Sequence, residues 1–292
     1  MIMKNILFAL LTCSLFACNT STEEKKPATP EWKEQEAKHV KTQYTIASVK
    51  QMSIDTFKAK YNQQQQDVIL ALNRVDINNL KKADTIVVPS DASTNLMEYS
   101  IFPYNLASIK DVKKIIFFSY GAQAWGAYEN GHLVKWGPTN MGRQNAQTPT
   151  GLFFANWKAE ETRSTVDDEW ILKWNFNIAN KDGVGWHQYE MPGYPASHSC
   201  LRLFEADAKY LYDWADQWIQ KNEQELLAQG TPVIVFGSYP FGQPKPWLAL
   251  AQNPDALDIT PDAMDKLVTP NLDKILKEQQ NREQVAAQKE SK

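Results

Sequence analysis

Runs of apolar and aromatic residues with strand character recur between residues 113 and 189. Asn130-Gly131 separates two of these runs, and this dipeptide favours the two-residue type I′ turn of a β-hairpin because both residues tolerate positive φ. The pattern therefore predicts a mainly β region. The predicted strands are 114–119, 122–129, 132–136, 152–157, 169–178 and 184–189.

After residue 205 the hydrophobic pattern changes to a helical period. Apolar residues between 205 and 228 fall on one face of a helix, and Gly230 stands where that helix would end. A strand over 231–236 is predicted next. Residues 262–292 are polar and helix-prone without an apolar stripe, which predicts a helix that ends in a frayed tail.

The pattern of residues over 44–90 predicts a small unit with the order strand, helix, helix, strand. Ser53 and Asp67 are placed to cap the two helices, and a β-branched run before Pro89 predicts the second strand. The diagnostic residues are Thr56-Phe57, Tyr61, Leu72-Asn73, Leu80 and Ile86-Val87-Val88-Pro89. On these residues the unit resembles a LysM module, and the resemblance implies binding to the N-acetylglucosamine backbone of peptidoglycan.

Two stretches of this unit depart from the LysM pattern. Ser53-Ile54-Asp55-Thr56 replaces the family's usual Gly-Asp-Thr, and Lys82-Ala83-Asp84 stands where Pro-Gly is common. A spacer domain without glycan binding is therefore the alternative interpretation.

The composition is that of a soluble globular protein. The chain has 292 residues, 43% of them hydrophobic and 22% charged, with a net charge of −3. This length predicts one substantial domain with a small module or tails. A chain without an excess of positive charge does not attract the negatively charged phosphate backbone of nucleic acids. Nucleic acid is therefore not an expected partner.

The N-terminus has the features of a secretory signal. Lys4 precedes an apolar run from Ile6 to Phe16, which is too short to span a bilayer. Leu15-Phe16-Ala17-Cys18-Asn19 resembles the lipobox of bacterial lipoproteins, which implies cleavage before Cys18 and lipid on its thiol. Residues 1–17 are then the signal peptide and 18–43 a tether. An ordinary secretory signal with an incidental cysteine is the alternative.

Export leaves Cys200 as the one cysteine with no partner. The chain has three cysteines, of which Cys13 is lost with the signal and Cys18 is lipidated. A leftover thiol in an exported protein is a candidate reactive group, whereas the alternative is a small buried apolar side chain. Two of the four histidines, His187 and His198, lie close to it in sequence.

A nearby imidazole would turn this thiol into a nucleophile. A free thiol is mostly protonated at neutral pH, and a histidine within hydrogen-bond reach can accept its proton. His187 is the natural base because it lies on a predicted strand that can aim the ring. His198 is two residues from Cys200, so both side chains face the same side of an extended segment, whereas that of Ser199 faces away.

Two other kinds of site use the same residue types. His187, His198 and Cys200 are three potential zinc ligands, with Asp207 or water as a fourth, but the chain has no spaced cysteine pair. A papain-like protease places its cysteine before its histidine in the chain, and here the order is reversed. We therefore expect neither a metal nor a cofactor.

The residues around this thiol carry a family motif. Trp186-His187 is followed by the run from Pro192 to Leu203, which contains Ser197-His198-Ser199-Cys200-Leu201-Arg202. These residues resemble the catalytic signature of the L,D-transpeptidases (YkuD type), in which a histidine precedes Ser/Thr-His-Gly-Cys. Thr148-Pro149-Thr150-Gly151 stands at the family's Thr-Pro-x-Gly.

The resemblance implies an α+β fold for the chain, with a mainly β catalytic domain that contains one long helix. The catalytic domain is expected over 113–238, after a linker at 91–112. The LysM-like module with its βααβ order occupies 44–90, and a C-terminal helical tail is expected over 239–292.

The resemblance also implies a reaction on peptidoglycan stem peptides. Cys200, activated by His187, would form a thioester with a stem tetrapeptide and transfer it to an amine, which makes a 3-3 cross-link. His198 would orient the site or line it. Ser197, Ser199, Arg202 and Trp186 would hold the oxyanion or the substrate. The protein is then expected in the cell envelope, anchored to a membrane through lipid on Cys18 and facing the periplasm or extracytoplasmic space.

Two alternatives to transpeptidation are left open. Water in place of the amine would make the protein an L,D-carboxypeptidase or another hydrolase of stem peptides. A non-catalytic wall anchor is the second alternative, because Ser199 stands where the family most often has glycine. If this position requires positive φ, serine is strained there.

Overall fold

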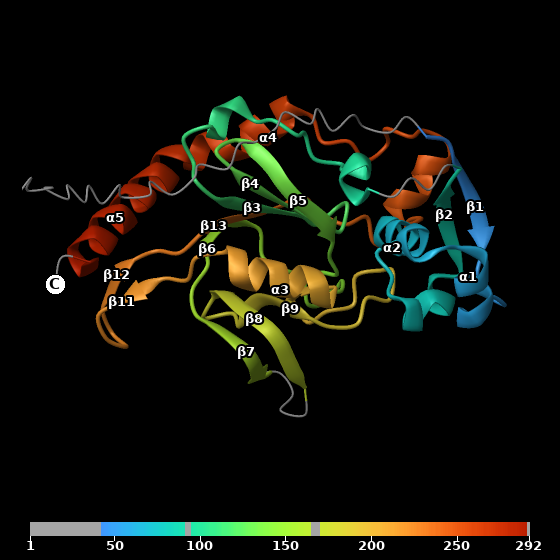
Figure 1. Ribbon diagram of the computed structural model, residues 1–292, viewed down its shortest axis with the longest axis horizontal. Helices are drawn as coiled ribbons and strands as arrows, with labels where there is room; N and C mark the ends of the chain where they lie inside the picture. Colours follow the sequence, from blue (N-terminus) through green and yellow to red (C-terminus); the bar gives the residue numbers. More distant parts are fainter. Residues whose placement is uncertain (1–41, 91–94, 165–169, 291–292) are drawn as a thin grey trace, which may run out of the picture. The chain divides into compact units, whose positions relative to one another are not determined.

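The computed structural model describes residues 42–90, 95–164 and 170–290 (Figure 1). All of them fall within one of the two compact units of the chain, Ala37–Lys292. The predicted signal peptide, Cys18 and almost all of the tether lie outside the described residues. No described helix is both long enough and apolar enough to cross a membrane.

A five-stranded sheet is the centre of the fold, with strand order β5-β4-β3-β13-β6. β3 and β13 pair in parallel, with Val233 opposite Ile116, and the other neighbours are antiparallel. The predicted hairpin joins β4 to β5, and Asn130 and Gly131 adopt the expected positive φ of 48° and 82°. The strands are β3 (Ile115–Ser119), β4 (Ala124–Glu129), β5 (His132–Pro138), β6 (Gly151–Phe154) and β13 (Pro232–Phe236).

Each face of this sheet covers its own apolar core. Successive side chains of a strand point to opposite faces, so Ile115 and Phe117 enter one core and Ile116 and Phe118 the other. All five residues of β3 are buried, as expected for a central strand covered on both sides.

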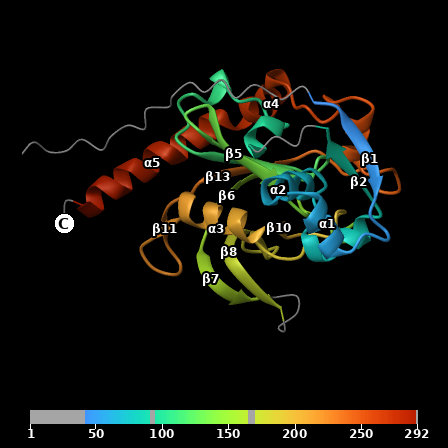
Figure 2. The ribbon, with the colours of Figure 1, turned by 45° about the vertical axis from the view of Figure 1, so that its right-hand side comes forward.

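A second sheet, of four strands, has the order β10-β9-β8-β7 and carries the residues of interest (Figure 2). β10 and β9 are parallel, which places Arg202 opposite His187. β7 was not predicted, because its sequence is almost entirely charged and polar. The strands are β7 (Lys158–Arg163), β8 (Ile171–Ala179), β9 (Val184–Gln188) and β10 (Leu201–Leu203).

The predicted long helix after residue 205 is wrong in length. Helix α3 (Glu205–Trp214) packs against β8 and β9, but the chain is extended from Ala215. Asp216 and Thr231 exchange hydrogen bonds there, since the carbonyl of Asp216 accepts from the Thr231 N–H at 2.9 Å. These tertiary contacts replace the helix with a short hairpin of β11 (Ile219–Gln220) and β12 (Leu226–Ala228).

Gly230 therefore has a role other than ending a helix. A Cβ atom at this position would lie 2.1 Å from the carbonyl oxygen of Ala155 and 2.3 Å from that of Asp216. Glycine is required because the backbones approach so closely.

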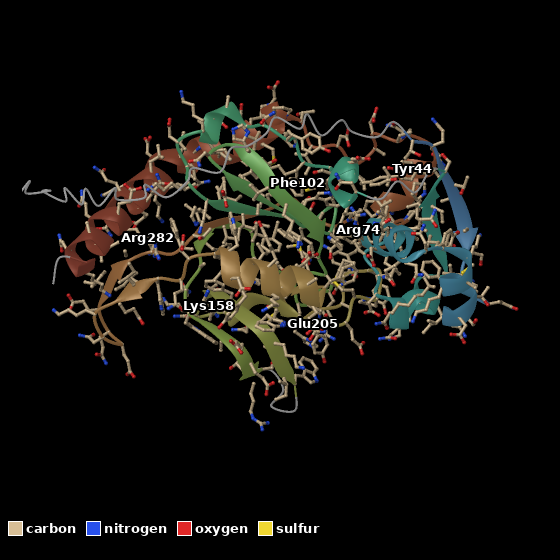
Figure 3. All side chains as sticks on the ribbon, viewed as in Figure 1. Tyr44, Arg74, Phe102, Lys158, Glu205 and Arg282 are labelled. Atoms are coloured by element: carbon tan, nitrogen blue, oxygen red, sulfur yellow. The ribbon has the colours of Figure 1, made fainter. Side chains whose placement is uncertain are left out.

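The C-terminal region is packed against the rest of the fold more closely than a helical tail implies. Met264, Val268 and Ile275 are buried in the core that contains Phe117. Arg282 donates to the carbonyl oxygens of Gln217 and Gln229, which fastens the last helix to the β11–β12 hairpin (Figure 3). The helices are η4 (Pro246–Ala251), α4 (Pro261–Val268), η5 (Thr269–Asn271) and α5 (Leu272–Glu290).

The N-terminal module has the predicted strands and two helices in the predicted order, with β1 antiparallel to β2, but a further 3-10 helix, η1, lies between α2 and β2. Ser53 caps α1 as expected, whereas α2 begins before Asp67, at a capping box formed by Asn62 and Gln65. The LysM resemblance itself remains a prediction. The elements are β1 (Tyr44–Ser48), α1 (Ile54–Lys60), α2 (Gln63–Leu72), η1 (Ile77–Ala83) and β2 (Thr85–Pro89).

The described part of the predicted linker also belongs to the core. Phe102, Leu106 and Ile109 are buried together with residues of the central sheet. The short helices η2 (Leu96–Tyr99) and η3 (Ala107–Ile109) lie in this segment.

Candidate active site

His187 lies on β9, between two hydrogen-bonded neighbour strands, and only 3% of it is exposed. Its Nδ1 atom is 2.9 Å from the backbone carbonyl oxygen of Gln188. A carbonyl only accepts hydrogen bonds, so Nδ1 carries the proton and Nε2 keeps its lone pair. The imidazole is therefore held in the tautomer that acts as a base through Nε2.

Burial keeps this imidazole neutral. Desolvation lowers the pKa of His187 from 6.5 to about 4, the Gln188 hydrogen bond opposes the shift, and the charge of Arg202 adds to it. At neutral pH the ring is free of a second proton and ready to accept one.

Cys200 directly precedes β10 and is partly buried. Its Sγ atom lies 3.7 Å from the carbonyl oxygen of Gly183, to which the thiol donates. Burial raises the pKa of the Cys200 thiol, while a backbone hydrogen bond from Gly185 and the charge of Arg202 lower it. The resting site thus contains a neutral thiol and a neutral imidazole.

One small pocket brings these groups together. Its cavity measures about 20 Å³, which is room for one water molecule. The lining residues come from β7, β8, β9, β10 and the segments that flank them: Ser164, Trp170, Leu172, His187, Tyr189, Ser197, His198, Cys200 and Arg202.

The turn that carries the nucleophile is strained at Ser199. This residue has a φ of 87°, the left-handed region that favours glycine. The conformation is held by hydroxyl groups, because Thr148 donates to the Ser199 carbonyl oxygen at 2.8 Å and Ser197 donates to the Cys200 carbonyl oxygen at 2.6 Å. The predicted Thr-Pro-x-Gly motif thus contacts the nucleophile turn through its first residue.

His198 lines the same pocket, and its ring lies 5.3 Å from that of Trp170. Its Nδ1 atom is shielded from solvent and has no hydrogen-bond partner among the described residues. Desolvation lowers the pKa of His198, and the charges of Arg143 and Arg202 lower it further. The lowered pKa keeps the ring neutral at neutral pH.

Arg202 is anchored beside the base. Its guanidinium lies 4.5 Å from the ring centre of Tyr189, and Nη1 donates to the carbonyl oxygen of Glu190 at 3.4 Å. Burial lowers the pKa of Arg202, while Tyr189 and Cys200 oppose that shift.

Trp186 does not lie in the site, contrary to the sequence prediction. Alternation along β9 sends His187 into the pocket and Trp186 into the opposite core, where its ring centre is 4.6 Å from that of Phe176. Trp186 therefore supports the strand from behind.

Asn140 was missed by the sequence analysis and holds the loop before the nucleophile. Its Oδ1 accepts from the Ala196 N–H at 3.1 Å, and its Nδ2 donates to the Tyr194 carbonyl oxygen at 2.5 Å. The backbones of Asn140 and Arg202 also exchange two hydrogen bonds of 2.9 Å. Nothing in the local sequence distinguishes this asparagine from any other in a loop.

Trp170 and Tyr189 were also not predicted as site residues. Both lie within predicted strands, where aromatic side chains are commonly part of the core. In the structure Trp170 directly precedes β8 and Tyr189 directly follows β9, so their place in the pocket depends on where these strands begin and end.

The zinc alternative requires at least three ligand side chains around one point. Among the described residues, no group of three His, Cys, Asp or Glu side chains is arranged to hold a metal ion. Asp207, proposed as a fourth ligand, lies instead 2.9 Å from the ammonium of Lys135.

Residues 113–235 match the family model described as the L,D-transpeptidase catalytic domain (YkuD). His187, Cys200 and Arg202 fall inside this range, as does Thr148. This part of the chain is therefore similar to the family that the motif around Cys200 predicts. No curated protein matches the chain.

Several solved L,D-transpeptidases are similar to part of this chain. That from Stackebrandtia nassauensis has 23% identity and a TM-score of 0.36, over 44% of this chain and 57% of that one. That from Mycobacterium smegmatis has 20% identity and a TM-score of 0.35, over 43% and 59%. That from Xylanimonas cellulosilytica has 22% identity and a TM-score of 0.34, over 42% and 60%. The matches therefore span 57 to 60% of the length of these three proteins.

Proposed function

We propose that this protein is a peptidoglycan L,D-transpeptidase in which Cys200 is the nucleophile and His187 the general base. The observation that carries the proposal is the pocket that contains both groups, with the Nδ1 proton of His187 fixed on the Gln188 carbonyl. An imidazole held in this way accepts a proton through Nε2.

The first half-reaction forms a thioester. The Cys200 thiol gives its proton to His187, and Sγ attacks the carbonyl carbon of the diamino acid at position three of a stem tetrapeptide. The bond to the terminal D-Ala breaks, and the proton held by His187 passes to the leaving amine. Charge on the carbonyl oxygen would be stabilised by backbone N–H groups around Ser199 and Cys200.

The second half-reaction releases the enzyme. The side-chain amine of a second stem attacks the thioester, the Cys200 sulfur leaves as thiolate and regains a proton, and a 3-3 cross-link results. Arg202 would anchor the nucleophile loop or a substrate carboxylate. Ser197 acts on the nucleophile turn through its hydrogen bond to the Cys200 carbonyl.

Disaccharide-tetrapeptides incubated with purified protein test this reaction. Mass spectrometry should show a cross-linked dimer, and the Cys200→Ala variant should form none. A product shortened by one D-Ala without a dimer would indicate a hydrolase. A dimer that persists in the variant would contradict the role of Cys200.

A carbapenem separates an enzyme from a non-catalytic anchor. By resemblance to the family, an active site should be acylated, which would add the carbapenem's mass to the peptide that contains Cys200. Absence of the adduct, together with absence of any turnover, would favour the anchor.

The attachment to the envelope is proposed from the sequence. We propose that lipid on Cys18 tethers the protein to a membrane and that the LysM-like module binds glycan strands. Mass spectrometry of the mature N-terminus tests the first, with Cys18→Ser as control. Co-sedimentation of the protein with purified glycan strands tests the second.

A further inference from the structure

The loop between His187 and Cys200 is contacted by the N-terminal module. The backbone N–H of Asp76 donates to the Met191 carbonyl oxygen at 2.8 Å, and the Met191 N–H donates to Asp76 Oδ2 at 2.7 Å. Next to this pair, Val75 and Pro192 form an antiparallel bridge. The module thus contacts the loop at Met191, four residues after the proposed base His187.

The Asp76 carboxylate is itself fixed within the module. Asp76 is the N-cap of η1, where Oδ1 accepts from the Asn79 backbone N–H at 2.9 Å and Oδ2 from Asn79 Nδ2 at 2.7 Å. With the Met191 N–H, three donors converge on two oxygens. A carboxylate satisfies all of them, whereas an amide would turn its own NH₂ group toward one.

The neighbouring residues make this contact rigid. Met191 is fully buried, and Gly193 has a φ of 80°, a backbone conformation that favours glycine. Arg74 is also fully buried, and its Nε donates at 2.9 Å to the carbonyl oxygen of Ala122, which lies in the turn between β3 and β4.

Arg74 also stacks on the C-terminal region, because its guanidinium lies 5.1 Å from the ring centre of Trp247. Residues 74–76 are therefore fixed to the central sheet on one side and to the nucleophile loop on the other. A displacement of this segment would be transmitted to the loop, since its hydrogen bond to Ala122 is buried and its hydrogen bonds to Met191 are close and partly buried.

We infer that Asp76 is a positioning residue for the active site, which sets the start of the loop that carries Cys200. Asp76 contacts neither reacting group and acts through Met191. In this respect it is the counterpart of Asn140, which holds the end of the same loop. The expected effect of Asp76 on turnover rests on the proposed function. Its expected effect on the reactivity of the Cys200 thiol does not.

Asp76→Ala tests the inference, with Asn62→Ala as matched control. Asn62 is an exposed N-cap of α2 in the same module, and its side chain accepts from the Gln65 N–H at 3.0 Å. Loss of either cap should destabilise the helix that it begins. Asp76→Ala alone should displace the nucleophile loop.

Two measurements distinguish positioning from stability. The pH dependence of iodoacetamide alkylation at Cys200 should move in Asp76→Ala toward that of an ordinary thiol, because a loosened loop lets water reach the sulfur. The kcat of cross-linking should fall by about 10- to 100-fold. Asn62→Ala should change neither.

Asp76→Asn keeps one side-chain oxygen as an acceptor and replaces the other with an NH₂ group. This variant takes the place of Asp76→Ala if the alanine variant does not fold. An alkylation profile and a kcat equal to those of Asn62→Ala would overturn the inference. If the wild type makes no cross-link, the proposed function fails, yet the alkylation profile still decides the role of Asp76.

Discussion

The proposed base and the proposed nucleophile are held in different ways. His187 lies inside a sheet, where β8 and β10 pair with its strand on both sides. Cys200 ends a loop whose shape depends on side chains from elsewhere, including Asp76, Asn140 and Thr148. The position of the base is therefore a property of the fold, and that of the nucleophile is a property of a few hydrogen bonds.

This difference separates two kinds of mutation. Replacement of His187 should impair catalysis and leave the fold intact, because the hydrogen bonds between β9 and its neighbour strands use backbone atoms. Changes in the contacts of the loop should displace the sulfur and alter chemistry and stability together. Four experiments test this difference between the base and the nucleophile.

Replacement of His187 by alanine is expected to have the largest effect. Thioester formation should slow by about 10²- to 10⁴-fold because the general base is lost, while the circular dichroism spectrum stays that of the wild type. His132→Ala, on β5 and outside the pocket, is the matched control. Activity within a factor of about two of the control would remove His187 from the mechanism.

Replacement of Asn140 by alanine should be the next largest. The Tyr194 carbonyl and the Ala196 N–H would lose their partners, at a cost of about 1 to 3 kcal/mol in the free energy of unfolding. Displacement of the loop should lower kcat by about 10- to 100-fold.

Asn156→Ala controls for loss of a buried asparagine. Its Nδ2 donates to Asn177 Oδ1 at 3.1 Å, and neither residue lines the pocket. Denaturation curves compare the free energies of unfolding of Asn140→Ala and Asn156→Ala. If these are equal, equal kcat values for the two variants would show that the loop needs no support from Asn140.

The pH dependence of the rate of thioester formation should show that His187 is buried. Because the folded-state pKa of His187 is about 4, below the ordinary 6.5, the ring stays neutral until the pH falls near that lower value. The rate of thioester formation should therefore be nearly constant from about pH 8 to pH 5 and decline only below that. An acid limb centred near 6.5 would contradict a buried base.

Replacement of Ser199 by glycine should have the smallest effect. Glycine adopts the positive φ of 87° without strain, so the free energy of unfolding should rise by up to about 1 kcal/mol. Turnover should be retained, because Ser199 contributes its carbonyl to the Thr148 contact. Urea denaturation and kcat measure the two expectations, and a less stable variant would show that the serine side chain is needed here.

Much of the central sheet was predictable because its signals are local. Asn130-Gly131 sets a hairpin through the conformations of two residues, and the apolar run of β3 has no plausible place outside a core. The motif around Cys200 likewise predicted the pocket residues His187 and His198. Such features depend on neighbours in sequence.

Features that depend on distant partners were missed or mistaken. The helical period continues past Trp214, but hydrogen bonds between Asp216 and Thr231 extend the chain there. Trp186 fits a substrate site by proximity to His187, yet strand alternation turns it away. Asp76 and Asn140 have no sequence signature, because their function lies in which loop the fold brings to them.

The parallel pairing of β3 with β13 has a consequence for folding. Val233 lies opposite Ile116, so the centre of the sheet joins residues that are 117 positions apart in the chain. Such long-range closure is intrinsically slow, and the apolar β3 lacks its parallel neighbour until β13 has emerged from the ribosome. This buried strand, apolar in all but its last residue, is thus also an aggregation hazard during synthesis, and a chain truncated before β13 leaves that edge permanently open.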